Sequence, residues 1–340
     1  MKPARILLTG ATGFIGSHTW LSLLAAGFRV VGIDDFSNSS PAVLERLQRI
    51  AGSAPEFVRA DVTDAAALDA VFARGPIDAV VHFAAFKAVG ESALRPLAYY
   101  ANNVGGLLAL TQAMARHGCK TLVFSSSATV YGKPETLPIP EDALLAAVNP
   151  YGATKLMGEN ILRDVAAADP AWSIALLRYF NPVGAHESGL IGEDPRGTPN
   201  NLMPYVAQVA VGKRARLQVF GNDYATPDGT GVRDYIHVLD VAAGHVDALH
   251  HLLDQRRSIT ANLGTGRGHS VLEVVRAFER ASGVAVPCEF VARRAGDVAA
   301  SYADVTRAHT ELNWRATRDL DTMCADSWRW QRMNPDGLAG

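Results

Sequence analysis

The chain has 340 residues, a formal net charge of −2 and a pI of about 6.6, and its length allows two lobes with separate hydrophobic cores. The nearly balanced charge gives no sign of nucleic acid or an anionic membrane as a partner, and no apolar run reaches the roughly 18 residues of a membrane span. The three cysteines, Cys119, Cys288 and Cys324, lie far apart and form no C-x-x-C pair. We therefore expect a reducing compartment, the cytoplasm, and no disulfide framework.

Short apolar, β-branched runs alternate with helical stretches from residue 5 to about 180. This alternation predicts an α/β fold, a Rossmann-type doubly wound parallel sheet covered by helices on both faces. The expected strands are 5–9, 29–33, 56–59, 78–83, 120–125 and 173–179, and the expected helices include 14–26, 64–73, 92–117 and 151–168.

The rest of the chain is richer in glycine, proline and asparagine, which are typical of turns and binding loops. We expect a cofactor-binding domain over residues 1–180 and a smaller, mixed α/β substrate lobe over 181–340, with a cleft between them. The sequence leaves open whether segments near 235–264 return to the first domain.

A glycine run follows the first expected strand and opens the first expected helix. Gly10, Gly13 and Gly16 have the spacing G-x-x-G-x-x-G. Gly10 permits a tight turn, Gly13 lets the main chain approach a phosphate, and Gly16 lets the helix pack closely on the sheet. Free N–H groups and the positive end of the helix then face the anion. The run predicts a site for a dinucleotide pyrophosphate, the alternative being an ordinary loop.

Two acidic residues, Asp34 and Asp35, end the second expected strand. An acid roughly 20 residues after such a glycine turn accepts a hydrogen bond from the ribose 2′-OH of the adenosine. The same carboxylate would repel a 2′-phosphate, so Asp34 favours NAD over NADP. The alternative is that Asp34 only caps a turn.

Tyr151 and Lys155 have the spacing Tyr-x-x-x-Lys on an expected helix, so both side chains lie on one face, one turn apart. A tyrosine base at neutral pH needs its pKa, ordinarily about 10, lowered by roughly 3. A lysine charge about 5 Å away lowers it by roughly 2, and a positively charged nicotinamide ring could supply the rest. The pair predicts an enzyme that takes a proton and a hydride from one carbinol. The alternative is an amphipathic helix with a stacked Tyr–Lys pair.

Three consecutive serines, Ser125 to Ser127, end an apolar strand at the edge where open parallel sheets bind their ligands. A hydroxyl there can relay a proton between a substrate and Tyr151. The alternative is a serine-rich loop. No G-x-S-x-G motif is present, so we do not expect a hydrolase nucleophile.

Together these motifs resemble those of the extended short-chain dehydrogenase/reductases, and longer stretches narrow the resemblance to the UDP-galactose 4-epimerases. The stretches that are similar to that family are 81–92, 125–132, 177–186, 199–204, 220–224 and 228–237. The similarity runs from residue 5 to about 335.

The resemblance implies a role for each matching position. Tyr151 is implied as the base, Lys155 as its electrostatic partner and Ser127 as the proton relay. The implied NAD-binding residues are Gly10, Gly13, Phe14, Ile15, Gly16, Asp34, Asp35, Phe36, Ser37, Asn38, Ser39, Asp61, Val62, Phe83, Ala84, Ala85, Lys87, Asn102, Tyr151, Lys155 and Phe180. The implied UDP-sugar residues are Ser127, Ala128, Thr129, Tyr179, Asn181, Asn200, Asn201, Leu202, Gln218, Val219, Phe220, Arg233, Arg294, Asp297 and Ser301.

The chain departs from the family pattern at two positions. Ala85 stands where the family often has glycine, and we expect no loss of NAD from the added methyl group. Ser301 stands where some members carry a tyrosine that closes the pocket beside the sugar C2 substituent. Members with a small residue there accept N-acetylated sugars as well, so the resemblance implies that breadth here.

The histidines of the C-terminal half do not have the spacing of a metal site. For His245, His250 and His251 we expect a solvated helix face and no metal. Arg233 and Arg294 carry the charge that suits a pyrophosphate, although Arg294 alone is also compatible with a solvated basic loop.

The resemblance implies reversible C4 epimerisation of UDP-glucose and UDP-galactose through a 4-keto intermediate, with NAD kept bound, and a homodimer paired through helices 92–117 and 151–168. One alternative is a nucleotide-sugar 4,6-dehydratase, which needs an Asp-Glu pair where this chain has Ala128 and Thr129. The other is a non-catalytic nucleotide-sensing regulator, a class that usually loses the Tyr or Lys that this chain retains.

Overall fold

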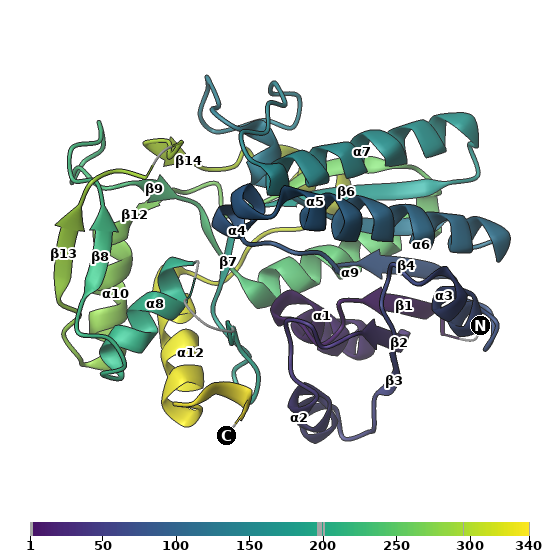
Figure 1. Ribbon diagram of the computed structural model, residues 1–340, viewed down its shortest axis with the longest axis horizontal. Helices are drawn as coiled ribbons and strands as arrows, with labels where there is room; N and C mark the ends of the chain where they lie inside the picture. The colour runs from purple at the N-terminus through teal and green to yellow at the C-terminus, as the bar shows by residue number, and fades with distance from the viewer. Residues whose placement is uncertain (1–2, 196–198, 200, 295, 340) are drawn as a thin grey trace.

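A seven-stranded parallel sheet forms the centre of the larger lobe in the computed structural model, which describes residues 3–195, 199, 201–294 and 296–339. The strand order is β11-β6-β5-β4-β1-β2-β3 (Figure 1). The strands are β1 (Arg5–Thr9), β2 (Arg29–Asp34), β3 (Glu56–Arg59), β4 (Ala79–His82), β5 (Thr121–Ser127), β6 (Ser173–Tyr179) and β11 (Ile259–Leu263).

Helices cover both faces of this sheet because successive side chains of each strand point to opposite faces. On β1, Ile6 and Leu8 belong to one hydrophobic core, and Leu7 belongs to another. The first core contains side chains of α1 (Phe14–Ala25), α2 (Ala42–Ala51) and α9 (Val238–Gln255), and the second those of α3 (Ala65–Phe72), α6 (Gly105–Arg116) and α7 (Pro150–Ala168). The predicted doubly wound Rossmann-type fold is confirmed.

The order of the strands reverses between β1 and β4. From β1 the chain proceeds through β2 and β3 to one edge, and from β4 through β5 and β6 toward the other. Open parallel sheets bind ligands outside the carboxyl ends of the strands at such a reversal. The candidate site is therefore expected beyond Thr9 and His82.

The prediction of a single helix over 92–117 is wrong. The segment forms α4 (Val89–Leu94), α5 (Pro96–Tyr99), the π-helical turn η1 (Tyr100–Val104) and then α6. Pro96 accounts for the break, because a proline has no N–H to donate and disfavours helical geometry in the residue before it. Arg95 accordingly has φ −132° and ψ 52°.

The smaller lobe packs three short sheets against three helices (Figure 1). Its strand pairs are β7 (Asn181–Val183) with β10 (Tyr235–His237), β8 (Leu217–Phe220) with β13 (Cys288–Val291), and β9 (Val232–Arg233) with β12 (His269–Ser270) and β14 (Ala300–Ser301). The helices are α8 (Leu202–Ala210), α10 (Val271–Ser282) and α12 (Leu320–Met333). The short elements η2 (Ala128–Tyr131), α11 (Thr306–Leu312) and η3 (Gly337–Ala339) complete the fold.

The chain crosses between the lobes more than once. β11 joins the large sheet beside β6, and α9 packs on α1 (Figure 1). From α2, Arg46 donates a hydrogen bond to the Leu190 carbonyl over 2.9 Å and lies over the ring of Trp330 in α12. Among the described residues, no helix is long and apolar enough to cross a membrane.

A buried ion pair joins α7 to the sheet. Arg178 of β6 and Glu159 of α7 are 1% and 0% exposed, and two hydrogen bonds of 2.7 and 2.6 Å connect them. Ser126 of β5 donates a further bond to the same carboxylate over 2.5 Å. Burial alone raises the pKa of Glu159, but the hydrogen bonds from Arg178 outweigh it and hold that pKa below its usual value.

Removing one partner leaves the other charge buried without compensation. We expect Arg178→Met to lower the free energy of unfolding by about 3–5 kcal/mol, measured by urea denaturation. Arg163 bonds the same carboxylate over 2.6 Å but is 41% exposed. Arg163→Ala is therefore the matched control, with an expected loss below about 1 kcal/mol. Equal losses in the two variants would contradict the argument from burial.

Candidate active site

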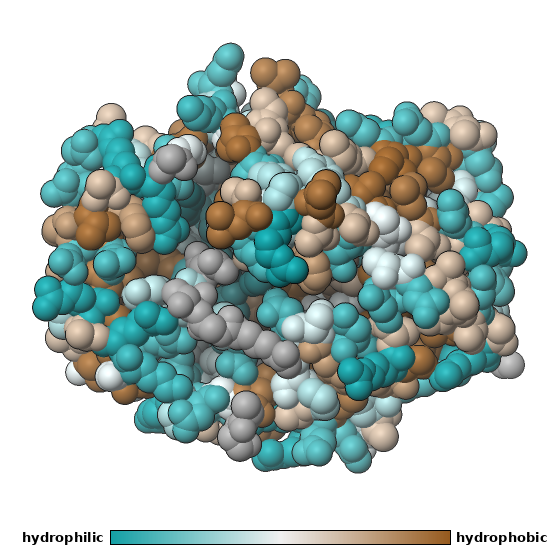
Figure 2. All heavy atoms as spheres, in the orientation of Figure 1, coloured by the Kyte–Doolittle hydropathy of each residue, from teal (hydrophilic) through white to brown (hydrophobic). Residues whose placement is uncertain are grey.

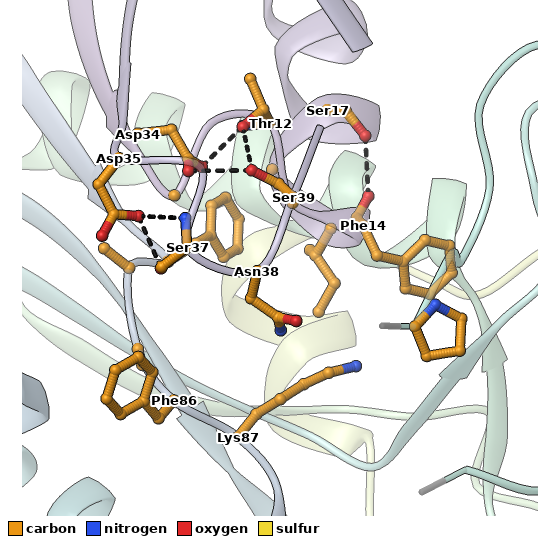
Figure 3. A pocket seen from close by; sticks show the side chains of 18 of the residues that line it. Thr12, Phe14, Ser17, Asp34, Asp35, Ser37, Asn38, Ser39, Phe86 and Lys87 are labelled. Carbon is orange, nitrogen blue, oxygen red and sulfur yellow. Dashed lines mark hydrogen bonds between the residues drawn. The ribbon is translucent and has the colours of Figure 1, made fainter. Parts of the chain in front are cut away.

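A cavity of about 750 Å³ lies at the carboxyl ends of β1, β2, β4 and β5, where the order of the strands reverses. Its lining comes from both halves of the chain, from the turn after β1 to the segment 191–195 and Leu338 near the C-terminus. Figure 3 shows part of this lining, with Thr12, Asp34 and Ser39 on one side and Lys87 reaching in from another.

The glycine turn has the geometry of a phosphate cradle. Gly10 has φ +64°, and a Cβ atom on Gly16 would lie 2.1 Å from the Gly10 carbonyl oxygen. A Cβ on Gly13 would have only that oxygen as a close neighbour, so this residue faces the open cavity. Helix α1 begins at Phe14 with no side-chain cap and no acid in its first turn. Its free N–H groups and positive end are therefore available to an anion.

Asp34 caps the turn and also lines the cavity. Its carboxylate accepts hydrogen bonds from the N–H of Thr12 over 3.1 Å and from the Ser39 hydroxyl over 3.0 Å (Figure 3). It also accepts from the N–H of Phe36 over 2.9 Å. A carboxylate can accept about four hydrogen bonds. Both interpretations of Asp34 from the sequence are thus compatible, because capacity remains for a ribose hydroxyl.

Most of the residues expected to bind the cofactor line this cavity, and two do not. The ring of Phe36 packs on Phe57, with centroids 5.1 Å apart, and Phe180 is 8% exposed in a small core with Tyr131. Those that line the cavity are Gly10, Gly13, Phe14, Ile15, Gly16, Asp34, Asp35, Ser37, Asn38, Ser39, Asp61, Val62, Phe83, Ala84, Ala85, Lys87, Asn102, Tyr151 and Lys155.

Local structure places Tyr151 and Lys155 in the first turns of α7. Pro150 occupies the first helical position, and the Asn149 side chain caps the helix by accepting from the N–H of Gly152 over 2.8 Å. The Lys155 ammonium is buried and donates to the Ser125 carbonyl over 2.7 Å. This bond ties α7 to the end of β5, next to the hydroxyl of Ser127.

The sequence argument considered the charge of Lys155 near Tyr151, and the structure adds further groups that act on the phenol. Burial raises the pKa of Tyr151, while a hydrogen bond with Ser127 and the charge of Lys87 act in the opposite direction. Burial also lowers the pKa of Lys155 to about 7. The charge of Lys87 thus also favours the phenolate of Tyr151, and Lys155 in addition holds α7 against β5 through its bond to the main chain.

Sequence reasoning missed Glu193, which also lines the cavity. Its carboxylate accepts hydrogen bonds from Lys87 over 2.9 Å and from the amide of Asn201 over 2.7 Å. The segment around Glu193 has no periodic pattern and no recognisable motif. No local signal could have shown that it meets a lysine 106 positions earlier.

The residues expected on the substrate side gather mainly on the strands of the smaller lobe. The Arg294 guanidinium lies 3.8 Å from the ring centroid of Phe220, and Arg233 is 3.4 Å from the Asp297 carboxylate. Ser301 pairs with Arg233 between β14 and β9. In the smaller lobe, Asn181 starts β7, Asn201 and Leu202 open α8, and Gln218 and Val219 are on β8. In the larger lobe, Ala128 and Thr129 follow Ser127 and begin η2, and Tyr179 ends β6 and lines the cavity. Asn200 lies outside the described residues.

The prediction that the three α9 histidines lie on a solvated face is wrong for two of them. His245 is 0% exposed, with its ring 4.6 Å from that of Phe83, and His251 is 6% exposed. Only His250 is on the surface. The reason is that α9 packs on α1 and the sheet, which the sequence did not indicate. Among the described residues, no group of side chains is arranged to hold a metal ion.

Known proteins are similar to this chain over nearly its whole length. A profile of the GDP-mannose 4,6 dehydratase family matches residues 7–327. The UDP-glucose 4-epimerase of Bacillus subtilis (strain 168) is 59% identical over 332 residues, covering 98% of each chain.

Two solved structures match the fold closely. UDP-glucose 4-epimerase from Bifidobacterium longum, in complex with NAD⁺ and UDP, has a TM-score of 0.95 and 53% identity, covering 98% of this chain and 100% of that one. The enzyme from Stenotrophomonas maltophila, with bound NAD and formylated UDP-arabinopyranose, has a TM-score of 0.96 and 55% identity, covering 98% and 99%.

Proposed function

The chain belongs to the UDP-glucose 4-epimerase family, and we propose that it interconverts UDP-glucose and UDP-galactose by inverting C4 of the sugar. It is an isomerase that depends on NAD and passes through a 4-keto sugar. The observation that carries the proposal is the position of Tyr151 and Lys155, at the start of α7, in the wall of a cavity that also contains the glycine turn after β1.

The residues of the cavity fit NAD. The turn from Gly10 to Gly16 leaves main-chain N–H groups open to a pyrophosphate, and Asp34 retains an acceptor for a ribose hydroxyl. The Asp34 carboxylate would repel the 2′-phosphate of NADP. When bound, NAD supplies the uptake of hydride from C4 and its return to the opposite face.

The chain's own residues move the proton. Tyr151 Oη removes the proton of the 4-hydroxyl, with Ser127 Oγ as the relay between them, and returns it after the keto sugar has turned. Lys155 is the proposed electrostatic partner of the phenolate and also keeps α7 against β5 through the Ser125 carbonyl, and the charge of Lys87 favours the phenolate as well. Microscopic reversibility then lets the same groups serve both directions.

The smaller lobe supplies the groups that we propose for the UDP-sugar. Two guanidinium groups, of Arg233 and Arg294, suit a diphosphate, and the ring of Phe220 lies beneath one of them. We propose that residues 1–180 together with α9 and β11 form the cofactor-binding lobe and that the rest of 181–340 forms the lobe that binds the UDP-sugar.

The two alternatives lack support at specific residues. A 4,6-dehydratase needs carboxyl groups after the relay hydroxyl, and Ala128 and Thr129 have none. A regulator without activity has no need of Tyr151 and Lys155 at the cavity wall, where both lie.

The base can be tested by removing one oxygen atom. We expect Tyr151→Phe to lower kcat by roughly 10²–10⁴-fold, the usual contribution of a general base, with NAD still bound and the fold intact. Turnover of UDP-galactose and the nucleotide released on denaturation are the measurements. Tyr205→Phe, on α8, is the control, and we expect it to retain wild-type turnover. More than a tenth of wild-type activity in Tyr151→Phe would exclude it as the base.

We propose that the substrate range includes UDP-GlcNAc and UDP-GalNAc, because Ser301 leaves room that a tyrosine ring would fill. Ser301→Tyr should abolish conversion of the acetylated pair and spare UDP-galactose, since the clash is confined to the C2 substituent. Ser301→Ala should retain both activities. The assay incubates each UDP-sugar and resolves the two epimers. Wild-type protein that converts UDP-galactose but not UDP-GalNAc would refute this proposal.

We propose a homodimer formed through α4 to α7. Leu94 and Leu97 are 83% and 82% exposed, and Leu108 and Met157 are 41% and 44% exposed. Figure 2 shows apolar side chains gathered over α6 and α7 on this face. A second copy with the same face is the self-complementary occupant of a two-fold interface.

Charges placed on this face should separate the subunits. We expect Leu97→Glu with Met157→Glu to convert a dimer into a monomer, with mass measured by sedimentation. Phe290→Glu places the same charge on an apolar residue of β13 that is 48% exposed, and this control should remain a dimer. A monomeric wild-type protein would refute the proposal.

A further inference from the structure

The carboxylate of Asp234 is a buried charge that the proposed reaction does not use. Asp234 lies between β9 and β10 and is 0% exposed. Its Oδ1 accepts from the N–H of Thr265 over 2.8 Å and from the hydroxyl of the same residue over 2.6 Å. Its Oδ2 accepts from the N–H of Gly266 over 3.0 Å and from the N–H of Ala303 over 3.1 Å. A carboxylate can accept about four hydrogen bonds, so these uncharged donors fill it.

These partners fit the ionised carboxylate and not a neutral group of the same shape. Main-chain N–H groups, which can only donate, bond to both oxygens. An amide in this place would turn its NH₂ toward at least one main-chain N–H, whichever way it was oriented. Loss of the charge would therefore leave buried main-chain donors without a partner, which is costly.

The carboxylate joins three segments that are distant in the sequence. Thr265 and Gly266 follow β11, a strand of the large sheet, whereas Ala303 follows β14 of the smaller lobe. Asp234 itself links β9 to β10. A Cβ on Gly264 would lie 2.5 Å from Oδ2 and 2.7 Å from the Cβ of Ala303, so the three segments are in close contact here. One buried charge therefore fixes these strands relative to the large sheet.

The main chain of Asp234 is bonded to two of the residues expected at the substrate. Its N–H donates to the carbonyl of Ser301 over 3.0 Å, and its carbonyl accepts from the N–H of Asn181 over 3.0 Å. Arg233 is the third, and it is aligned with Ser301 where β9 runs parallel to β14 (Figure 1). A shift of the main chain at Asp234 would therefore move all three.

We propose that Asp234 is a positioning residue, whose buried carboxylate holds Arg233, Asn181 and Ser301 where they meet the UDP-sugar. The inference rests on the proposed function, which assigns these three residues to the substrate. Asp234 is fully enclosed, so it acts through these neighbours and not by contact with the substrate. None of the described groups that donate to its carboxylate lines the cavity proposed for the cofactor, so we expect NAD to bind without it.

The experiment measures the Kd of UDP by calorimetry with the holoenzyme, together with kcat and KM for UDP-galactose. We expect Asp234→Asn to raise the Kd and the KM by about tenfold or more, because a misplacement of about 1 Å in a site can cost roughly 10²-fold. The factor by which kcat falls should be smaller than the factor by which KM rises. The content of bound NAD should stay the same.

The matched control is a second buried carboxylate. Asp240 of α9 is 2% exposed and accepts from the N–H groups of Thr317 and Arg318 over 3.1 and 3.0 Å, and also from both of their side chains. In the described structure these donors have no hydrogen bond to the three substrate-side residues. We expect Asp240→Asn to lower the free energy of unfolding in urea, as Asp234→Asn does, and to keep the wild-type Kd for UDP. Equal losses of UDP affinity in the two variants would overturn the proposal.

A milder pair of variants decides the matter if Asp234→Asn does not fold. Thr265→Val removes the hydroxyl that donates to Oδ1, and Thr265→Ser keeps it. We expect the Kd for UDP to rise in Thr265→Val and to stay at the wild-type value in Thr265→Ser. An unchanged UDP affinity in Thr265→Val, or in a folded Asp234→Asn, would contradict the positioning role.

Coupling to Arg233 tests the path of the effect. Arg233→Ala alone should weaken UDP binding, and adding Thr265→Val to it should weaken binding by a smaller factor than in the wild-type background, since the guanidinium is already absent. Fully multiplicative effects would count against the proposal. Wild-type protein that binds UDP but does not convert UDP-galactose would refute the proposed function alone, because the UDP titrations still decide the role of Asp234. Wild-type protein that does not bind UDP would refute both.

Discussion

The buried pairing of Arg178 with Glu159 is the constraint on which the arrangement of the site depends. It holds α7 against β6, and the Ser126 hydroxyl brings β5 into the same network. Burying two charges is costly, so the pair is stable only while every polar atom keeps its partner. On α7, Tyr151 lies about two turns and Lys155 about one turn before Glu159. On β5, Ser127 follows Ser126. This network therefore fixes how α7 and β5 lie relative to each other, and with them the positions of Tyr151 and Ser127.

The cavity is formed by two parts of the chain that are held in place by different contacts. The glycine turn and Asp34 belong to the sheet and its first helix, whose close packing leaves no room for a Cβ on Gly16. The segment 191–195 belongs to the other side and is attached through Trp330 of α12 and through the N–H of Leu338, which donates to Asp194 over 2.8 Å. Residues of both lobes therefore line the cavity that we propose for the cofactor.

The site also shows why a motif is an incomplete account of its electrostatics. Tyr-x-x-x-Lys suggests that the lysine supplies the charge for the base. Burial of Lys155 weakens that charge, since a low-dielectric environment disfavours the ammonium. Lys87, which is half exposed and paired with Glu193, keeps its charge. The helical spacing was correct, and the tertiary structure added a second lysine whose charge favours the phenolate.

The sequence by itself determined the features that depend on a few neighbouring residues. These are the turn at Gly10 to Gly16, the end of β2 at Asp34, the shared face of Tyr151 and Lys155, and the family that such motifs indicate. Backbone sterics and the helical period act over one or two turns, so the pattern is enough to predict them. Only the tertiary structure decided the pairing of Lys87 with Glu193, the break of the helix expected over 92–117 into α4, α5 and η1, and the burial of His245 under α1 and the sheet. Charge pairing and burial depend on which distant segments pack together, and no local pattern carries that information.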